Sequence, residues 1–281
     1  MGILVVLGIA ASALVQQVPA APGSCPTGSD SDFDGLSDSC ELGVAARFAP
    51  ILVVSPSACN WDAVSERLQG AYLFGVKPTP RGLRVVYLPA YLQDCGWAGA
   101  KCLLRLRGGC SPHTGDSEFI AVDLTVDSSA TRWQVEQVFL SAHCFGDNDP
   151  DCRWHIPSEL EWLEDTPFVW VAEGKNANYR SRSACDSGHW YFDTCDRNER
   201  STRFPITSSA QNIGSERAPF PQHLDDPGCV VASEAIMLAG GGGTECIWTD
   251  SIFHGWQDAS EGGSTGYRRY LVDVAQFASS P

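Results

Sequence analysis

Short apolar runs separated by turn residues dominate the pattern of hydrophobic and polar positions along the chain. Runs of this kind, rich in Val, Ile, Leu and aromatic residues and bounded by Gly, Pro, Asp or Ser, are typical of β-strands. They occur at residues 49–55, 71–76, 82–92, 118–126, 133–142, 166–172 and 244–249. Helical spacing is limited to residues 42–48, 157–163 and 267–277. The pattern predicts an all-β fold, a β-sandwich of mainly antiparallel strands with long loops and a few short helices.

The N-terminal segment has the features of a signal peptide. An uncharged apolar run ends in small residues, and Val18-Pro19-Ala20 fits a cleavage site. The run is shorter than the roughly 20 residues of a spanning helix, and no later stretch is long and apolar enough to span a membrane. We therefore expect residues 1–20 to be removed, and the mature protein to be secreted, extracellular and without a transmembrane segment.

All 12 cysteines lie after the expected cleavage site, and their even number favours disulfides in an oxidising compartment. Structural zinc is disfavoured because the chain has no CxxC pair. Spacing does not determine connectivity, but sequence-near pairs are our first predictions. These are Cys144 with Cys152, Cys185 with Cys195, and Cys229 with Cys246, besides a clamp of Cys25 with Cys40.

The formal net charge of −15 disfavours nucleic acid as a partner, because phosphate binding needs a basic surface. Acidic side chains in such number fit a protein that uses some of its carboxylates to bind cations. The roughly 260 residues left after cleavage are enough for one large all-β domain. We predict that this domain covers residues 43–281 and is a monomer.

Residues 25–42 contain a calcium-loop pattern of the DxDxDG type. Within it, every position of the EF-hand loop template is filled. In template order, the residues at positions one, three, five, six, seven, nine and twelve are Asp30, Asp32, Asp34, Gly35, Leu36, Asp38 and Glu41. Because residues 25–28 make a poor entering helix, we expect an isolated calcium loop of structural role, which calcium orders without being needed for the main domain.

The stretch 113–119, His-Thr-Gly-Asp-Ser-Glu-Phe, fits either a serine nucleophile or a set of metal ligands. The nucleophile interpretation is weak, since small residues that would open an oxyanion hole do not follow Ser117. In the ligand interpretation, Asp116 and Glu118 share one face of a strand. An antiparallel hairpin turning near residue 130 would bring His143 beside Glu118, provided that the register does not slip by one residue.

Three segments carry a resemblance to known families. Residues 113–124, 135–143 and 167–179 resemble the vacuolar-protein-sorting-related domain, whose pattern runs His-x-Gly-Asp-Trp-Glu, a strand, Ser-x-His and later Gly-Lys-His-Ala-x-Tyr. The His-x-x-Asp-x-Glu spacing is also similar to necrosis- and ethylene-inducing-like proteins. Those are secreted β-sandwich cytolysins that hold a divalent metal and recognise sphingolipid sugar headgroups.

The resemblance implies that His113, Asp116, Glu118 and His143 contact a second metal, with Asp94 as a further ligand. Lys175, Asn178 and Tyr179 fit a pocket beside the metal, although a tight polar turn after the strand explains these residues at least as well. The chain departs from the families in three respects. Ser117 replaces a Trp, Asn176 replaces a His, and the cytolysin heptapeptide is incomplete.

The function predicted from these motifs is metal-dependent recognition of a glycan or lipid headgroup, with toxin-like activity in view of the resemblance. A metal-dependent extracellular hydrolase and a purely structural module are the alternatives. Hard oxygen ligands with a little imidazole suit Mg²⁺, Ca²⁺ or Mn²⁺ at the second site, and Zn²⁺ is also compatible. Tryptophans, including Trp154, Trp162, Trp170 and Trp190, fit either sugar stacking or core packing.

Overall fold

A computed structural model describes thirteen stretches of the chain. They are residues 25, 27–30, 34–58, 60–64, 66–68, 70–94, 113–127, 132–142, 151–187, 193–206, 211–212, 229–231 and 244–246. Strands dominate these residues, and the helices among them are short. The prediction of an all-β fold with a few short helices is confirmed. No helix in the described part is long and apolar enough to cross a membrane.

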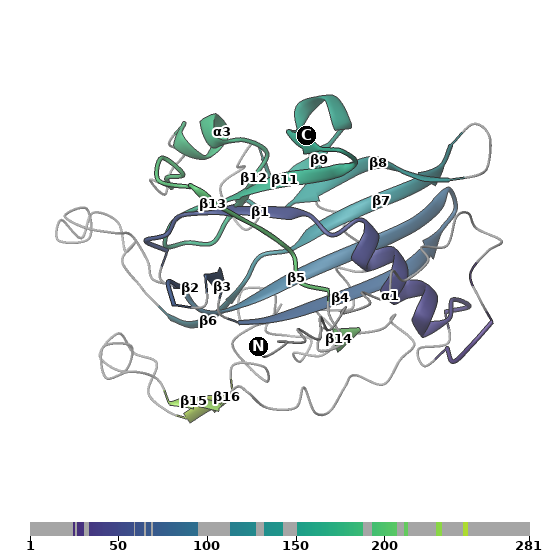
Figure 1. The fold of residues 1–281 in the computed structure, drawn as a ribbon, viewed down its shortest axis with the longest axis horizontal. Coiled ribbons are helices and arrows are strands. Elements are labelled where there is room, and N and C mark those ends of the chain that lie inside the picture. The colour runs from purple at the N-terminus through teal and green to yellow at the C-terminus, as the bar shows by residue number, and fades with distance from the viewer. Residues whose placement is uncertain are drawn as a thin grey trace, which may run out of the picture.

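The larger sheet has the strand order β14-β4-β5-β7-β8-β9, with β6 paired to β5 (Figure 1). Its long strands form antiparallel pairs, and β14 is parallel to β4. The strands are β4 (Gly70–Thr79), β5 (Gly82–Asp94), β6 (His113–Ser117), β7 (Ile120–Val126), β8 (Trp133–Leu140), β9 (Arg153–His155) and β14 (Gln211–Asn212).

The smaller sheet has the order β10-β11-β1-β13, with β12 paired to β11. Its strands are β1 (Ile51–Val54), β10 (Trp162–Leu163), β11 (Thr166–Val171), β12 (Asn178–Tyr179) and β13 (Arg200–Arg203). Here β1 and β11 run parallel, so the chain must cross over between them. Two small pairs complete the described strands, β2 (Trp61–Asp62) with β3 (Arg67–Leu68) and β15 (Cys229–Val231) with β16 (Thr244–Cys246).

One hydrophobic core receives side chains from both sheets. Alternate residues of β5, such as Val85 and Tyr87, are buried in the same cluster as Leu52 of β1 and Val169 of β11. The residues between them on β5 are buried as well, because the second face of the large sheet is also covered. A shared core is what a β-sandwich requires; the face-to-face arrangement of the two sheets stays a prediction.

The helix α1 (Asp38–Arg47) starts earlier than the predicted helix at 42–48, and thus inside the predicted calcium loop. The reason is a local cap: the Ser37 side chain accepts a hydrogen bond from the Cys40 amide. Acidic Asp38 in the first turn and basic Arg47 in the last turn also suit the helix dipole. Since α1 continues past residue 42, the boundary expected between loop and domain lies within a helix.

The helix predicted at 157–163 is wrong beyond its first turn. The structure has a single 3₁₀ turn, η1 (Pro157–Glu159), and the chain then enters β10. Glu159 caps the start of this turn, because its carboxylate accepts from the Ile156 amide at 3.1 Å, and it also accepts from Arg153 at 2.7 Å. The turn ends at Leu160, whose backbone is extended. The pKa of Glu159 is lowered to about 2, mainly by its hydrogen bond from Arg153. The pKa of His155 is lowered to about 4, mainly by burial. The helix predicted at 267–277 lies outside the described residues.

Two predicted disulfides are confirmed, Cys25–Cys40 and Cys185–Cys195. Cys152 is also disulfide-bonded, while Cys144, the partner predicted for it, lies outside the described residues. Cys229 and Cys246 face each other as Cα partners in the β15–β16 pair. Their positions are therefore consistent with the predicted Cys229–Cys246 disulfide.

The hairpin predicted between residues 118–126 and 133–142 exists as β7 and β8, with a change of register in its middle. Asp123 pairs with Gln137, but the next residue, Leu124, pairs with Val135. Glu136 is thus the extra residue of a β-bulge. The bulge shifts the inward–outward alternation of β8 side chains by one residue. Both halves of the hairpin can therefore keep their apolar residues in the core.

Tyr87 joins α1 to the large sheet. It is completely buried, and its hydroxyl donates to the carbonyl oxygen of Ala45 at 2.8 Å. That carbonyl belongs to the last turn of α1, where carbonyls lack intrahelical partners. Burial raises the pKa of Tyr87 well above its ordinary value, an effect that Arg203 partly opposes, so the hydroxyl stays a donor.

Tyr87→Phe should therefore lower the free energy of unfolding by about 1–3 kcal/mol, because a buried carbonyl loses its donor. The measurement is urea denaturation in the presence of calcium. Tyr72→Phe is the matched control: its hydroxyl donates to Leu68 at 2.8 Å from a half-buried position, where water can replace it. A loss for Tyr87→Phe no larger than that for Tyr72→Phe would contradict the role of this bond.

Candidate functional site: an N-terminal cation loop and a strand-end cluster

The N-terminal loop folds around the side chain of Asp30. One carboxylate oxygen accepts from the amide of Asp34 at 3.2 Å, and the other accepts from the amide of Gly35 at 3.1 Å. Gly35 has φ +95°, a conformation that favours glycine, and it stands where the calcium-loop template requires its sharp turn. The first, fifth and sixth positions of the template are therefore linked in the folded loop.

The two ends of this loop are held together. The Asp38 amide donates to the carbonyl of Ser29 at 2.7 Å, and the Cys25–Cys40 disulfide closes the same segment. Inside the loop, the Leu36 amide donates to Asp34 at 2.8 Å. No helix precedes the loop among the described residues 25 and 27–30, as the sequence predicted. Asp32, the third-position ligand, lies outside the described residues.

Glu41, the twelfth-position residue, is fully buried on α1. Its Oε2 accepts a hydrogen bond from Nδ2 of Asn212 at 3.0 Å, and Asn212 belongs to β14 at the edge of the large sheet. The neighbouring α1 residues Cys40 and Val44 belong to the shared core. This packing argues against the expectation that the loop orders independently of the main domain.

The described residues of the loop fit a hard cation such as Ca²⁺. Carboxylates and one backbone carbonyl are its preferred donors, and the turn at Gly35 brings the predicted ligands into one short loop. Among the side chains that the structure describes, no three His, Cys, Asp or Glu residues form a ready-made metal cluster. That description leaves out Asp32 of this loop and His143 of the second predicted site.

The second predicted site begins at the β5–β6 pair. Asp94 at the end of β5 is the Cα partner of His113, and Tyr91 is the partner of Asp116. Only the backbone is described at Asp94, His113 and Asp116, so the structure places these residues by register alone. Three predicted ligands thus lie on two adjacent, hydrogen-bonded strands at one end of the large sheet.

Glu118 lies in the break between β6 and β7, so the single strand predicted through Asp116 and Glu118 is interrupted there. Glu118 is held by Ser141, the residue after β8. Its Oε2 accepts from the Ser141 hydroxyl, and the Ser141 oxygen accepts from the Phe119 amide at 2.8 Å. The chain leaving β8 therefore returns to Glu118, as the predicted hairpin required. His143 is only two residues beyond Ser141 and lies outside the described residues. We refer to Glu118, Phe119, Ser141 and Asn178 as the strand-end cluster.

Asn178 joins this cluster from far along the chain. Its Nδ2 donates to the carbonyl of Phe119 at 3.4 Å. Its Oδ1 is buried and accepts no hydrogen bond from the described residues. Lys175, another residue of the predicted pocket, is instead half-buried in the turn before Asn178. Gly174 and Asn176 form this turn with φ values of +90° and +58°. Of the predicted pocket residues, Asn178 is the one that the structure bonds to Phe119, the residue after Glu118.

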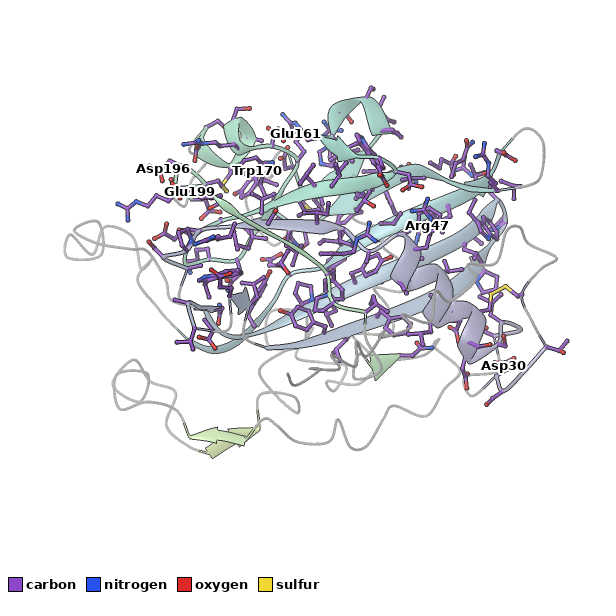
Figure 2. All side chains as sticks on the ribbon, viewed as in Figure 1. Asp30, Arg47, Glu161, Trp170, Asp196 and Glu199 are labelled. Atoms are coloured by element: carbon purple, nitrogen blue, oxygen red, sulfur yellow. A yellow bond between two sulfur atoms is a disulfide. The ribbon has the colours of Figure 1, made fainter. Side chains whose placement is uncertain are left out.

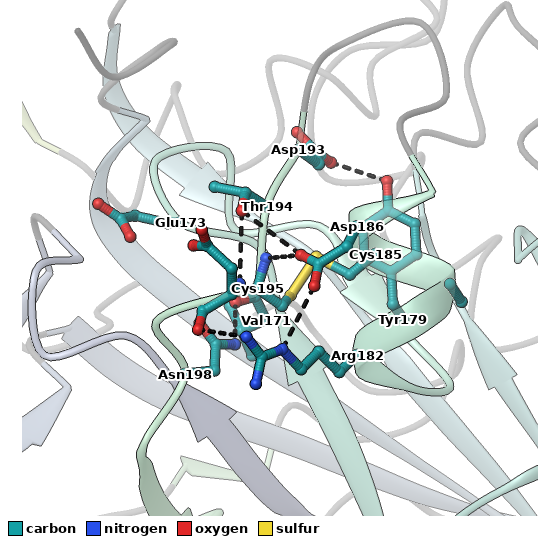
Figure 3. Close-up of a disulfide and its surroundings, with 12 residues drawn as sticks. Val171, Glu173, Tyr179, Arg182, Cys185, Asp186, Asp193, Thr194, Cys195 and Asn198 are labelled. Atoms are coloured by element: carbon teal, nitrogen blue, oxygen red, sulfur yellow. Dashed lines mark hydrogen bonds and ion pairs between the residues drawn. A yellow bond between two sulfur atoms is a disulfide. The ribbon is translucent and has the colours of Figure 1, made fainter.

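Tyr179 has a structural contact instead. Its hydroxyl donates to Asp193 at 2.7 Å, beside the Cys185–Cys195 disulfide (Figure 3). The helix α3 (Arg182–Asp186) is fixed to the same segment because Asp186 accepts from the Cys195 amide at 2.6 Å. The Thr194 carbonyl in turn accepts from the Glu173 amide at 3.0 Å. The disulfide therefore braces the turn that positions Asn178.

Sequence reasoning missed two polar residues that orient predicted ligands. Ser141 holds Glu118, and its only sequence signal was the Ser-x-His pattern of the resemblance. Asn212 holds Glu41 across a separation of 171 residues, and no pattern in the sequence connects them. Both contacts arise from tertiary packing.

Comparison of the chain with family models, with curated proteins and with solved structures finds no match. The resemblances to the vacuolar-protein-sorting-related domain and to the necrosis-inducing-like proteins stay predictions.

Ser141→Ala should lower the free energy of unfolding by about 1–3 kcal/mol, because the buried Phe119 amide loses its acceptor. Ser183→Ala in the exposed part of α3 should change it by less than about 0.5 kcal/mol. Chemical denaturation of both variants against the wild type is the measurement. Equal effects from the two substitutions would mean that Ser141 does not support the cluster.

Proposed function

We propose that this protein is a secreted calcium-binding protein that recognises a glycan or lipid headgroup through a second divalent cation at the strand-end cluster. The β5–β6 register makes Asp94 and His113 Cα partners, with Asp116 three residues further along β6. The observation that carries the proposal is the hydrogen bond by which Ser141 holds Glu118, just after the end of β6. Ordered outer hydrogen bonds of this kind support metal-binding carboxylates.

Calcium at the N-terminal loop has a structural task in this proposal. Asp30, Asp32, Asp34, the Leu36 carbonyl, Asp38 and Glu41 would hold the ion. Its charge would compensate the fully buried Glu41 carboxylate and the aspartates crowded beside it. Because Glu41 lies on a helix that packs into the shared core, binding stabilises the whole domain and not the loop alone.

The second cation has the recognition task. Asp94, His113, Asp116, Glu118 and His143 offer hard oxygen donors with some imidazole, which suits Mg²⁺, Ca²⁺ or Mn²⁺. Buried Asn178 donates to the carbonyl of Phe119, the residue after Glu118, and so supports the backbone beside this ligand. A cation with open coordination positions binds hydroxyl-rich or phosphate-bearing headgroups.

Saturating calcium should raise the melting temperature of the wild type by roughly 5–10 °C. The basis is a stabilisation of about 2.7 kcal/mol at 100 times the dissociation constant, spread over a domain of this size. Asp34→Asn should remove most of the rise. Calorimetric scans with calcium and with chelator make the test.

Glu161→Gln is the matched control, since Glu161 is exposed and lies well away from Asp30 of the loop (Figure 2), and the substitution changes the net charge by the same amount. It should retain the full calcium response. A wild-type melting temperature that is the same with calcium and chelator would contradict the proposed loop.

Metal stoichiometry separates the two sites. The wild type should bind two divalent ions by mass spectrometry, and Asp34→Asn or Asp116→Ala should each retain one. Ser117→Ala, the adjacent substitution on β6, should retain both, because the serine is not a predicted ligand. Ser141→Ala should keep both sites but weaken the second by about 10–100-fold.

Headgroup recognition is tested on glycan and lipid arrays with Mg²⁺ and Ca²⁺ present. Binding should be lost in Asp116→Ala and kept in Ser117→Ala. Array binding that survives Asp116→Ala would refute the role of the second cation, whatever the calcium loop does.

A further inference from the structure

A concave site lies away from the strand-end cluster. It is a pocket of about 710 Å³ between the end of α1, the start of β8 and the η1–β10 segment. That volume is within the roughly 300–1,000 Å³ of small-molecule sites. The pocket lies at the Trp133 end of β8, whereas Ser141 follows the other end. At about 3.3 Å per residue, the two sites are about 26 Å apart along this strand.

Aromatic side chains form the apolar part of the wall. Trp133, Trp162 and Phe48 line the pocket together with Val135 and Pro157. Trp162 is fixed in orientation, because its Nε1 donates to the Pro157 carbonyl at 2.7 Å. Trp133 rests against Gly82, where an added Cβ would lie 3.1 Å from the indole Cζ3. The aromatic surfaces are therefore rigid before any ligand arrives, which lowers the entropic cost of binding.

The charged residues of the pocket are paired with one another. Arg47 binds Asp165 through both terminal nitrogens, one of them at 2.6 Å. Arg132 and Asp127 form a looser pair at 3.6 Å. Two positive and two negative side chains leave the pocket without net charge, in a chain whose formal charge is −15. An anionic ligand would have to compete with Asp165 for Arg47.

One polar group of the wall, the Arg47 guanidinium, is still available to a ligand. The Trp133 Nε1 donor is instead buried behind the ring surface and has no hydrogen-bond partner among the described residues. An arginine has five N–H donors, so Arg47 retains three after pairing with Asp165. A purely aliphatic ligand would bury these groups without partners, at a cost in free energy.

We propose that this pocket binds a neutral sugar ring of a glycan, independently of both metal sites. A pyranose ring presents C–H groups on its face, which pack on indole rings, and hydroxyls on its edge, which pair with an arginine–carboxylate pair. The rigid tryptophans and the self-neutralised ion pairs match both halves of such a ligand. The site extends recognition beyond the strand-end cluster to a second sugar-binding surface on the same domain.

The probes are methyl glucoside, methyl mannoside, methyl galactoside, cellobiose, maltose and lactose, tested by saturation-transfer NMR in calcium-containing buffer. Glucuronate and decanoate serve as the anionic and aliphatic arms. At least one neutral sugar should bind with millimolar or better affinity, and Trp162→Ala should weaken its binding by at least about tenfold. Asp116→Ala should leave the affinity unchanged, which separates this site from the proposed metal-dependent one.

Trp61→Ala is the control, since Trp61 of β2 is also half-buried but does not line the pocket; it should change the affinity by less than about twofold. Asp165→Asn keeps the shape of a half-exposed side chain and should weaken binding severalfold even if Trp162→Ala fails to fold. Absence of binding by every neutral sugar would overturn the proposal. So would preferential binding of glucuronate or decanoate, or an affinity that neither Asp165→Asn nor a folded Trp162→Ala changes.

Discussion

The buried hydrogen bond from Tyr87 to the Ala45 carbonyl fixes the relation between α1 and the large sheet. Tyr87 also packs edge-on against Phe204, with ring centroids 5.2 Å apart, and the Phe204 amide donates to Pro50 just before β1. One side chain thus contacts the helix, the large sheet and the segment that leads from β13. Displacing it would loosen all of these elements, because they share one core.

The position of α1 connects the N-terminal loop to the buried interior. The residues that begin α1 also end the calcium pattern, so Glu41 belongs both to the predicted ion site and to the buried interior. At its other end, Arg47 and Phe48 form part of the wall of the proposed sugar pocket. The N-terminal loop and this pocket are therefore connected by one helix.

The strand β8 connects the two proposed recognition sites. Its last residues return the chain to Glu118 through Ser141, and its first residues supply Trp133 and Val135 to the pocket. The bulge at Glu136 lies between them and shifts the alternation by one residue. This shift allows one strand to serve a polar cluster at one end and an aromatic pocket at the other without exposing its core residues.

The sequence by itself determined the features that depend on local chemistry. Strand-like runs predicted the all-β fold, the DxDxDG pattern predicted the turn at Gly35, and near-neighbour spacing predicted the Cys25–Cys40 and Cys185–Cys195 disulfides. It did not predict that Ser37 would start α1 inside the loop. Nor did it predict that residues 157–163 would form a 3₁₀ turn followed by a strand. In both cases one or two capping residues set the boundary, and the hydrophobic periodicity of the segment does not reveal them. Tertiary structure alone decided the contacts of Asn212 with Glu41 and of Asn178 with Phe119, and the pairing of Arg47 with Asp165. Each joins residues that are far apart in the chain, and only the packing of both sheets and α1 around one core brings such residues together.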